Sequence, residues 1–263
     1  MKYSRSNKEI IVITGAGQGI GKEIAKNLDH KYDVLLISKS LNCKKTSEEI
    51  LKKDSKLVNC SRIIKYLKLD LEKSFDFIKI EKKINFKAYH KIHLILCAGI
   101  VDQYQEGYKY TSNWKKVFNI NLFSNIHLIN SFLKFYNKKQ KQNKIIVFSG
   151  GGAASSFKKF PIYSASKTAL VRTVENYSEI LSKRNISIFA IAPGAVKTKM
   201  LLKVQKIAKV RTKSKVEDVV KFINKCLQIN TNSFNGKLVH IKDDLSKISK
   251  NKNKNYLKLR RIQ

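Results

Sequence analysis

The feature that most constrains the fold is an apolar run near the N-terminus, followed directly by a glycine-rich turn and a helical segment. Glu9–Thr14 (EIIVIT) is rich in β-branched residues and predicts a buried strand. The turn after it carries Gly15, Gly19 and Gly21 in the spacing TGxxxGxG. Glycines allow a tight turn and a close approach of the backbone to a ligand. The N–H groups at the start of the next helix, around Gly19 and Ile20, can then bind a pyrophosphate.

The rest of the chain alternates between strand-like and helix-like segments. Apolar, β-rich runs predict further strands at residues 34–40, 63–69, 92–100, 144–148, 186–191 and 237–241. Helical periodicity predicts helices at residues 44–54, 72–86, 114–136, 161–184 and 216–228. Strands that alternate with helices form right-handed βαβ units, which place helices on both faces of a parallel sheet. We therefore predict an α/β fold, a Rossmann-like doubly wound parallel sheet in a single domain at residues 1–243, with a basic tail at residues 244–263.

The charge balance alone does not indicate a nucleic-acid partner. The chain has 54 basic and 19 acidic residues, which gives a formal net charge of +35. Such a balance can mark a protein that binds nucleic acid or an anionic membrane. Here the lysines are spread along the whole chain, which is typical of a solvated surface, so we expect neither partner. Attraction of an anionic substrate or cofactor is the alternative.

The cysteines and the hydropathy indicate a soluble cytoplasmic protein. The cysteines form no CxxC pair and no zinc spacing; they are Cys43, Cys60, Cys97 and Cys226. Reduced thiols are the simple interpretation. His90 and His93 have no obvious acidic or cysteine partner, so no metal site is expected. The N-terminus lacks the pattern of a signal peptide, and no segment approaches the roughly 20 apolar residues of a membrane span.

Small and polar residues follow several of the expected strands. Ser38 and Lys39 end the second strand, where folds of this kind bind the adenosine ribose of a dinucleotide. A small residue and a cation suit a 2′-phosphate and favour NADP over NAD; the alternative is that Lys39 is one more lysine in a lysine-rich chain. Asp70, after the third strand, is placed to contact the adenine edge. Ala98 and Gly99, after the fourth, let a cofactor ring lie against the backbone.

Tyr163 and Lys167 lie four residues apart, directly after Pro161. If Pro161 begins a helix, both side chains share one helical face. The charge of Lys167 favours the tyrosinate and is expected to lower the pKa of Tyr163 from its usual value of about 10. A tyrosine tuned in this way exchanges a proton with a carbonyl or carbinol oxygen. The alternative is an ordinary surface helix, because chance YxxxK matches are expected in a chain with eleven tyrosines.

In their order along the chain, these motifs resemble those of the short-chain dehydrogenase/reductase family, in its short branch. The resemblance covers residues 9–241 and rests on TGxxxGxG, Ala98-Gly99, Asn121, Ser149, Tyr163-xxx-Lys167 and Pro193-Gly194-xxx-Thr198. It implies hydride transfer between NAD(P)H and a small-molecule substrate, either a carbonyl or a secondary alcohol. It also implies a homodimer or homotetramer.

The resemblance implies a role for each matched residue. Tyr163 would be the general acid/base, Lys167 would lower its pKa and bind the nicotinamide ribose, and Asn121 would hold a water in a proton relay. Ser149 is the fourth catalytic candidate. The candidate cofactor-binding residues are Thr14, Gly15, Gln18, Gly19, Ile20, Gly21, Ser38, Lys39, Asp70, Leu71, Ala98, Gly99, Tyr163, Lys167, Pro193, Gly194, Val196 and Thr198.

The chain departs from the family pattern beside two of these motifs. Cys97 stands before Ala-Gly, where the family usually has Asn. The family's catalytic serine aligns with Gly150, one residue after Ser149. A shifted loop brings Ser149 into place, or Ser155 or Ser156 substitutes for it, or the donor is absent. An absent donor would weaken stabilisation of the developing oxyanion by a factor of about 100 or more.

Two other functions remain open. One is a catalytically weak NADP-binding scaffold or sensor of the same fold, and the other is a reductase of a sugar-type substrate. The substrate would be enclosed by the loop after Gly150 and by residues 199–215, a mixed apolar and basic segment. We expect residues 199–215 to form a lid that orders on binding, and their Lys and Arg side chains to favour an anionic substrate.

Overall fold

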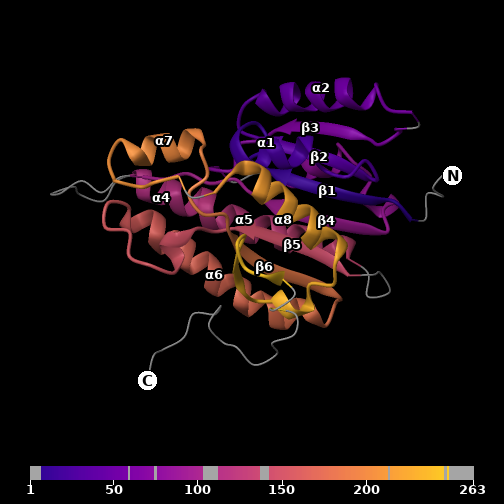
Figure 1. The fold of residues 1–263 in the computed structure, drawn as a ribbon. Coiled ribbons are helices and arrows are strands. Elements are labelled where there is room, and N and C mark those ends of the chain that lie inside the picture. Colours follow the sequence, from indigo (N-terminus) through magenta and orange to yellow (C-terminus); the bar gives the residue numbers. More distant parts are fainter. Residues whose placement is uncertain are drawn as a thin grey trace.

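The computed structural model has a seven-stranded parallel sheet between two layers of helices (Figure 1). It describes residues 7–58, 60–73, 76–102, 112–136, 142–212, 214–245 and 248. The strands are β1 (Glu9–Thr14), β2 (Tyr32–Ser38), β3 (Ile64–Lys68), β4 (Lys91–Leu96), β5 (Asn143–Phe148), β6 (Ile186–Ala192) and β7 (Leu238–His240). Their order across the sheet is β3-β2-β1-β4-β5-β6-β7, with every neighbouring pair parallel. The predicted Rossmann-like doubly wound sheet is confirmed.

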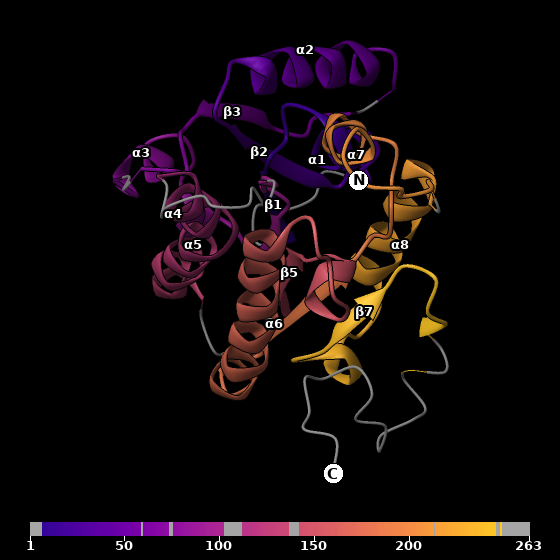
Figure 2. The same ribbon diagram turned by 90° about the vertical axis from the view of Figure 1, so that its left-hand side faces the viewer.

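Helices cover both faces of this sheet. The α-helices are α1 (Gly19–Lys26), α2 (Asn42–Asp54), α3 (Ile78–Glu81), α4 (Ser112–Phe118), α5 (Ser124–Phe132), α6 (Pro161–Ser182), α7 (Lys199–Gln205) and α8 (Val216–Gln228). Figure 2 shows α1, α2 and α8 on one side of the sheet and α4, α5 and α6 on the other. None of the helices in the described part of the chain is both long and apolar enough to cross a membrane.

The central strands are buried on both faces because their side chains alternate between two apolar cores. In β1, Ile10 and Val12 belong to one core, whereas Ile11 and Ile13 belong to the other. Successive side chains of a strand point to opposite faces, so each strand contributes to both cores. Polar groups that must meet a ligand are therefore confined to the ends of the strands.

The predicted helix over residues 72–86 is wrong, because among the described residues of this segment only those of the short α3 are α-helical. Asp70 and Asp76 each accept a hydrogen bond from the backbone N–H two residues further on, at 3.1 and 2.8 Å. Such short-range side-chain bonds favour turns over helix. Most of its described apolar residues are buried all the same, namely Phe77, Ile80, Ile84 and Phe86, whereas Ile78 is exposed. Phe77, for example, packs edge to face on Phe132, with ring centroids 4.9 Å apart.

The predicted helix over residues 114–136 is present but irregular. α4 and α5 are joined by a π-helical turn at Asn119–Phe123, and a 3₁₀ turn at Leu133–Phe135 follows α5. A single π turn inside an α-helix widens it locally and occurs frequently at functional sites. Asn121, one of the catalytic candidates, lies inside this turn.

The other predicted elements agree with the structure to within a few residues. α8 has the predicted bounds, and β4 ends at Leu96, so that Ala98 and Gly99 lie in the following loop. In the predicted tail, Leu245 and Ile248 are buried in the same apolar core as α8. Residues 246, 247 and 249–263 of the tail lie outside the described residues.

A buried lysine joins the centre of the sheet to the end of α8. Lys144 of β5 is 4% exposed. Its Nζ donates to the carbonyl oxygens of Cys226, Leu227 and Ile229 at 2.9, 2.7 and 2.6 Å. The last carbonyls of a helix have no partner within the helix, so a cation is a favourable ligand for them. Burial lowers the pKa of Lys144 to about 8, and the ammonium is still charged at neutral pH.

We expect Lys144→Met to lower the free energy of unfolding by about 2–4 kcal/mol, because buried carbonyls lose a charged donor. Denaturant unfolding followed by circular dichroism measures this change. Lys65→Met, at an exposed position of β3, is the matched control and should shift the free energy by less than about 0.5 kcal/mol. Equal stability of the two variants would contradict the role given to Lys144.

Candidate active site

The glycine turn brings β1, β4 and α1 together through backbone contacts. Gly15 has φ 70°, and a Cβ there would lie 3.0 Å from Ala98 Cα. A Cβ at Gly21 would lie 2.6 Å from the Gly15 carbonyl oxygen. The Thr14 hydroxyl accepts a hydrogen bond from Ala98 N at 3.2 Å. Side chains at either glycine would force the turn apart.

The start of α1 is available to an anion. The helix begins at Gly19, and the extended Gln18 before it makes no side-chain cap in the described structure. The first N–H groups of a helix lack intrahelical partners and attract negative charge. The turn and the start of α1 therefore fit a pyrophosphate, as the sequence predicts.

At the end of β2, Lys39 is exposed but already paired. Its Nζ lies 3.0 Å from Asp70 Oδ2 and 3.0 Å from Glu72 Oε2. Ser38 is buried and donates to the Ser40 carbonyl at 2.6 Å. Asp70, a candidate for the adenine edge, is thus a partner of Lys39 in this structure. Glu72 was not singled out from the sequence, because only the turn after β3 brings it to Lys39.

Asn121 and Lys167 converge on Gly99. Asn121 is fully buried; its Oδ1 accepts from Ile100 N at 2.9 Å, and its Nδ2 donates to Ile100 O at 2.9 Å and to Ser166 Oγ at 3.0 Å. A Cβ at Gly99 would lie 3.3 Å from Asn121 Oδ1 and 3.4 Å from Lys167 Nζ. The π turn thus holds the loop after β4 against the helix that carries Lys167.

Tyr163 and Lys167 share one face of α6, which has Pro161 in its first turn as the sequence predicts. Lys167 Nζ donates to the Phe148 carbonyl at 2.7 Å and lies 6.0 Å from the centroid of the Tyr163 ring. Burial raises the pKa of Tyr163 to about 12 and lowers the pKa of Lys167 to about 8. The expectation of a lowered tyrosine pKa is corrected here, because desolvation of the phenol outweighs the distant ammonium.

The loop after β5 places a glycine, not a serine, beside the phenol. A Cβ at Gly150 would lie 2.8 Å from Tyr163 Oη. The Ser149 hydroxyl donates instead to the Lys167 carbonyl at 3.5 Å. Ser155 and Ser156 are exposed.

Another hydroxyl near this loop was not singled out from the sequence. Ser164 Oγ is buried and makes no hydrogen bond among the described residues. It would lie 2.8 Å from a Cβ at Gly152. Its only sequence signal is its position directly after Tyr163.

The Pro193-Gly194 segment closes the other side of the site. Gly194 has φ 71°, and a Cβ there would lie 2.5 Å from Ser214 Oγ and 3.4 Å from His240 Nε2. Val196 pairs with Ser214 in an isolated parallel bridge. Ser214 and His240 were also missed, because they approach Gly194 from distant parts of the chain.

Thr198 links this segment to the glycine turn. Its hydroxyl caps α7 by accepting from Leu201 N at 3.2 Å. A Cβ at Gly19 would lie 3.5 Å from Thr198 Cγ2. The candidate residues after β1, β2, β3, β4, β5 and β6 therefore line one edge of the sheet. Small residues where backbones meet, a helix start without a side-chain cap, and a half-buried tyrosine beside a buried lysine fit a nicotinamide dinucleotide.

The chain is similar to known reductases over most of its length. The family model for short chain dehydrogenase matches residues 9–209. A 3-oxoacyl-[acyl-carrier-protein] reductase, FabG, of Buchnera aphidicola subsp. Baizongia pistaciae is 27% identical over 254 residues, covering 90% of this chain and 97% of that protein. The FabG of Buchnera aphidicola subsp. Acyrthosiphon pisum is 29% identical over 202 residues, covering 76% of this chain and 79% of that protein.

Solved structures share the fold. Levodione reductase superposes with a TM-score of 0.75 at 18% identity, covering 92% of this chain and 98% of that one. A 4-hydroxyisoleucine dehydrogenase complexed with NADH superposes with a TM-score of 0.69 at 20% identity, covering 88% and 96% of the two chains. Given the family match over residues 9–209, the chain belongs to the short chain dehydrogenase family and is an NAD(P)-dependent oxidoreductase.

Proposed function

We propose that the chain reduces a carbonyl group with NADPH and that Tyr163 donates the proton. The observation that carries this proposal is the convergence of Asn121, Lys167 and Gly99 beside Tyr163, at the sheet edge that also holds the phosphate-binding turn. The bound cofactor supplies the hydride. The protein's residues position the substrate carbonyl and handle the proton.

The two shifted pKa values suit a proton donor. With a pKa of about 12, Tyr163 is a neutral phenol at physiological pH. Lys167, with a pKa of about 8, is still mostly charged there. When Tyr163 releases its proton to the substrate oxygen, the Lys167 ammonium stabilises the tyrosinate in a site that excludes water.

We propose Ser149 as a second donor to the substrate oxygen. Its present contact to the Lys167 carbonyl, at 3.5 Å, is at the long limit for a hydrogen bond and therefore weak. Ser149 also directly precedes Gly150, whose Cβ would lie 2.8 Å from Tyr163 Oη, so a shifted loop would bring its hydroxyl toward the phenol. In this assignment Asn121 positions the loop after β4. It also holds the water of the proton relay next to Lys167.

For the substrate we propose a 3-oxoacyl thioester. The support is the similarity to FabG proteins, which extends over 90% of this chain in one case. The segment after Thr198 adds basic side chains at Lys199, Lys203 and Lys206 that suit an anionic carrier. We further propose that α7 and the residues up to 215 close over the substrate, and that the protein is a cytoplasmic homodimer or homotetramer with one domain at residues 1–243.

Tyr163→Phe is expected to lower kcat/KM for the carbonyl substrate by about 10²–10⁴-fold, because the general acid is lost while the binding surface stays. The measurement is NADPH oxidation with a panel of 3-oxoacyl thioesters, simple ketones and keto sugars. NADPH binding, followed by fluorescence titration, should change little in the variant and serves as the control. An active substrate whose rate survives the substitution unchanged would refute the mechanism.

The rate of reduction is expected to fall as the pH rises through about 8. Lys167 carries its charge below its pKa of about 8 and loses it above, whereas Tyr163 stays protonated up to about 12. The loss of charge removes stabilisation of the tyrosinate. The kcat for NADPH-dependent reduction, measured across this range with circular dichroism as a check on the fold, tests it. A flat profile through pH 8 contradicts the assignment of Lys167.

NADPH is expected to bind more tightly than NADH, and Lys39→Ala should reduce that preference by about tenfold or more, because a hydrogen bond to a charged group is lost. Titration of both cofactors into the wild type and the variant gives the ratio. Lys65→Ala, on the exposed side of β3, is the matched lysine control. Tighter binding of NADH by the wild type would overturn the role proposed for Lys39.

A further inference from the structure

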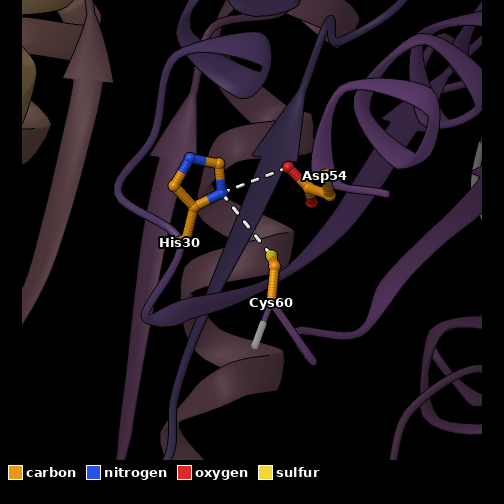
Figure 3. A group of neighbouring side chains, drawn as sticks. All are labelled: His30, Asp54 and Cys60. Carbon is orange, nitrogen blue, oxygen red and sulfur yellow. Dashed lines mark hydrogen bonds and ion pairs between the residues drawn. The ribbon is translucent and has the colours of Figure 1, made fainter. Parts of the chain in front are cut away.

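Three possible metal ligands meet at the edge of the sheet opposite the candidate active site. His30 lies in the turn before β2, Asp54 ends α2, and Cys60 lies in the loop before β3. These are the N-terminal ends of the strands, whereas the cofactor-binding candidates follow the C-terminal ends. Figure 3 shows the three side chains pointing toward one another.

The two donor separations that involve the imidazole nitrogen approach those of ligands around one ion. His30 Nδ1 lies 3.1 Å from Asp54 Oδ1 and 3.7 Å from Cys60 Sγ. All three donor atoms lie within 4.8 Å of one another. Zinc bonds of about 2.0–2.3 Å at tetrahedral angles separate nitrogen, oxygen and sulfur ligands by about 3.3–3.6 Å. The two distances from the imidazole nitrogen are close to that requirement.

A buried arginine fixes the position of two of the ligands. The side chain of Arg62 is 1% exposed, and its Nε and Nη2 donate to the two oxygens of Asp54 at 2.6 and 2.9 Å. Its Nη1 donates to the carbonyls of Leu28 and Asp29, directly before His30, at 3.3 and 3.4 Å. Metal-binding carboxylates are commonly oriented by hydrogen bonds of this kind. Asp54 and the turn that carries His30 are thus held in place before any ion binds.

Two partners approach one nitrogen of the imidazole. Asp54 and Cys60 both lie beside Nδ1 of His30. A protonated Nδ1 donates to Asp54 Oδ1 at 3.1 Å and leaves Cys60 Sγ, at 3.7 Å, with a weak contact. An ion placed between the three donors would bind all of them.

We propose that His30, Asp54 and Cys60 bind one zinc ion. Nitrogen, oxygen and sulfur donors together suit zinc better than magnesium or calcium. On binding, the Cys60 thiol releases its proton to solvent. The thiolate and the Asp54 carboxylate face the two charges of the ion, and because Asp54 is also paired with Arg62, the whole cluster keeps one net positive charge. His30 is 40% exposed, so water takes the fourth position. The ion fastens the turn before β2 to α2 and to the loop before β3.

The test is metal binding by the whole chain. Equilibrium dialysis against zinc should give one bound ion per wild-type chain, and cobalt in its place should give a sulfur-to-cobalt charge-transfer band. Loss of a group that only orients a metal ligand costs about 10- to 100-fold in metal affinity. Cys60→Ser and His30→Gln each remove a ligand itself, so each should weaken zinc binding by at least that factor. His90→Gln, a half-buried histidine outside any three-donor cluster in the described residues, is the matched control and should bind as the wild type does.

Two results would overturn the proposal. One is a wild-type chain that binds no zinc in the dialysis, or that takes up cobalt without the charge-transfer band; both measurements use the wild type alone. The other is zinc affinity unchanged in both Cys60→Ser and His30→Gln. NADPH binding by the variants should stay at the wild-type level, because the proposed ion lies at the far end of the strands.

Discussion

Burial of the central strands on both faces decides where this chain can carry polar function. Ile10 to Ile13 alternate between two cores, so the polar residues of β1 are those at its two ends, Glu9 and Thr14. Chemistry is then possible only where strands end and backbones emerge. The contacts at that edge are so close that a Cβ at Gly15 would lie 3.0 Å from the Ala98 backbone and one at Gly21 would lie 2.6 Å from the Gly15 carbonyl oxygen. The candidate active site is thus a consequence of sheet packing as much as of its reactive residues.

The parallel sheet and the positions of most helices and strands could be predicted from the sequence. The spacing of apolar residues and the glycines at turns are local signals that a sequence shows directly. α8 and the start of α6 at Pro161 are examples. The segment 72–86 has the apolar spacing of a helix, yet Asp70 and Asp76 turn its backbone by local hydrogen bonds. The spacing of apolar residues indicates which face of a segment is buried. It does not show where side chains accept hydrogen bonds from backbone N–H groups in place of a helix's own carbonyls.

The parts of the site that escaped prediction depend on burial and on contacts between distant segments. The YxxxK spacing places the Lys167 ammonium near Tyr163 and therefore predicts a lowered pKa. The pKa of Tyr163 is raised instead, because burial desolvates the phenol. The one-residue offset between Ser149 and Gly150 is visible in the sequence, but only the loop shows which of them faces the phenol. The cluster of His30, Asp54 and Cys60 has no sequence motif, because the fold alone brings its members together.

The π turn at Asn119–Phe123 makes the length of this helix matter, and not only its composition. A residue of an α-helix advances the side-chain direction by about 100°. A π turn holds one residue more than an α turn, so it takes up that residue without rotating α5 against α4. Removing a residue from the turn would restore a regular helix and keep Phe132 in the core, but it would lose the local geometry that directs Asn121 at Ile100. A deletion in the regular part of the helix would have no such turn to absorb it and would rotate one flank against the other by that angle.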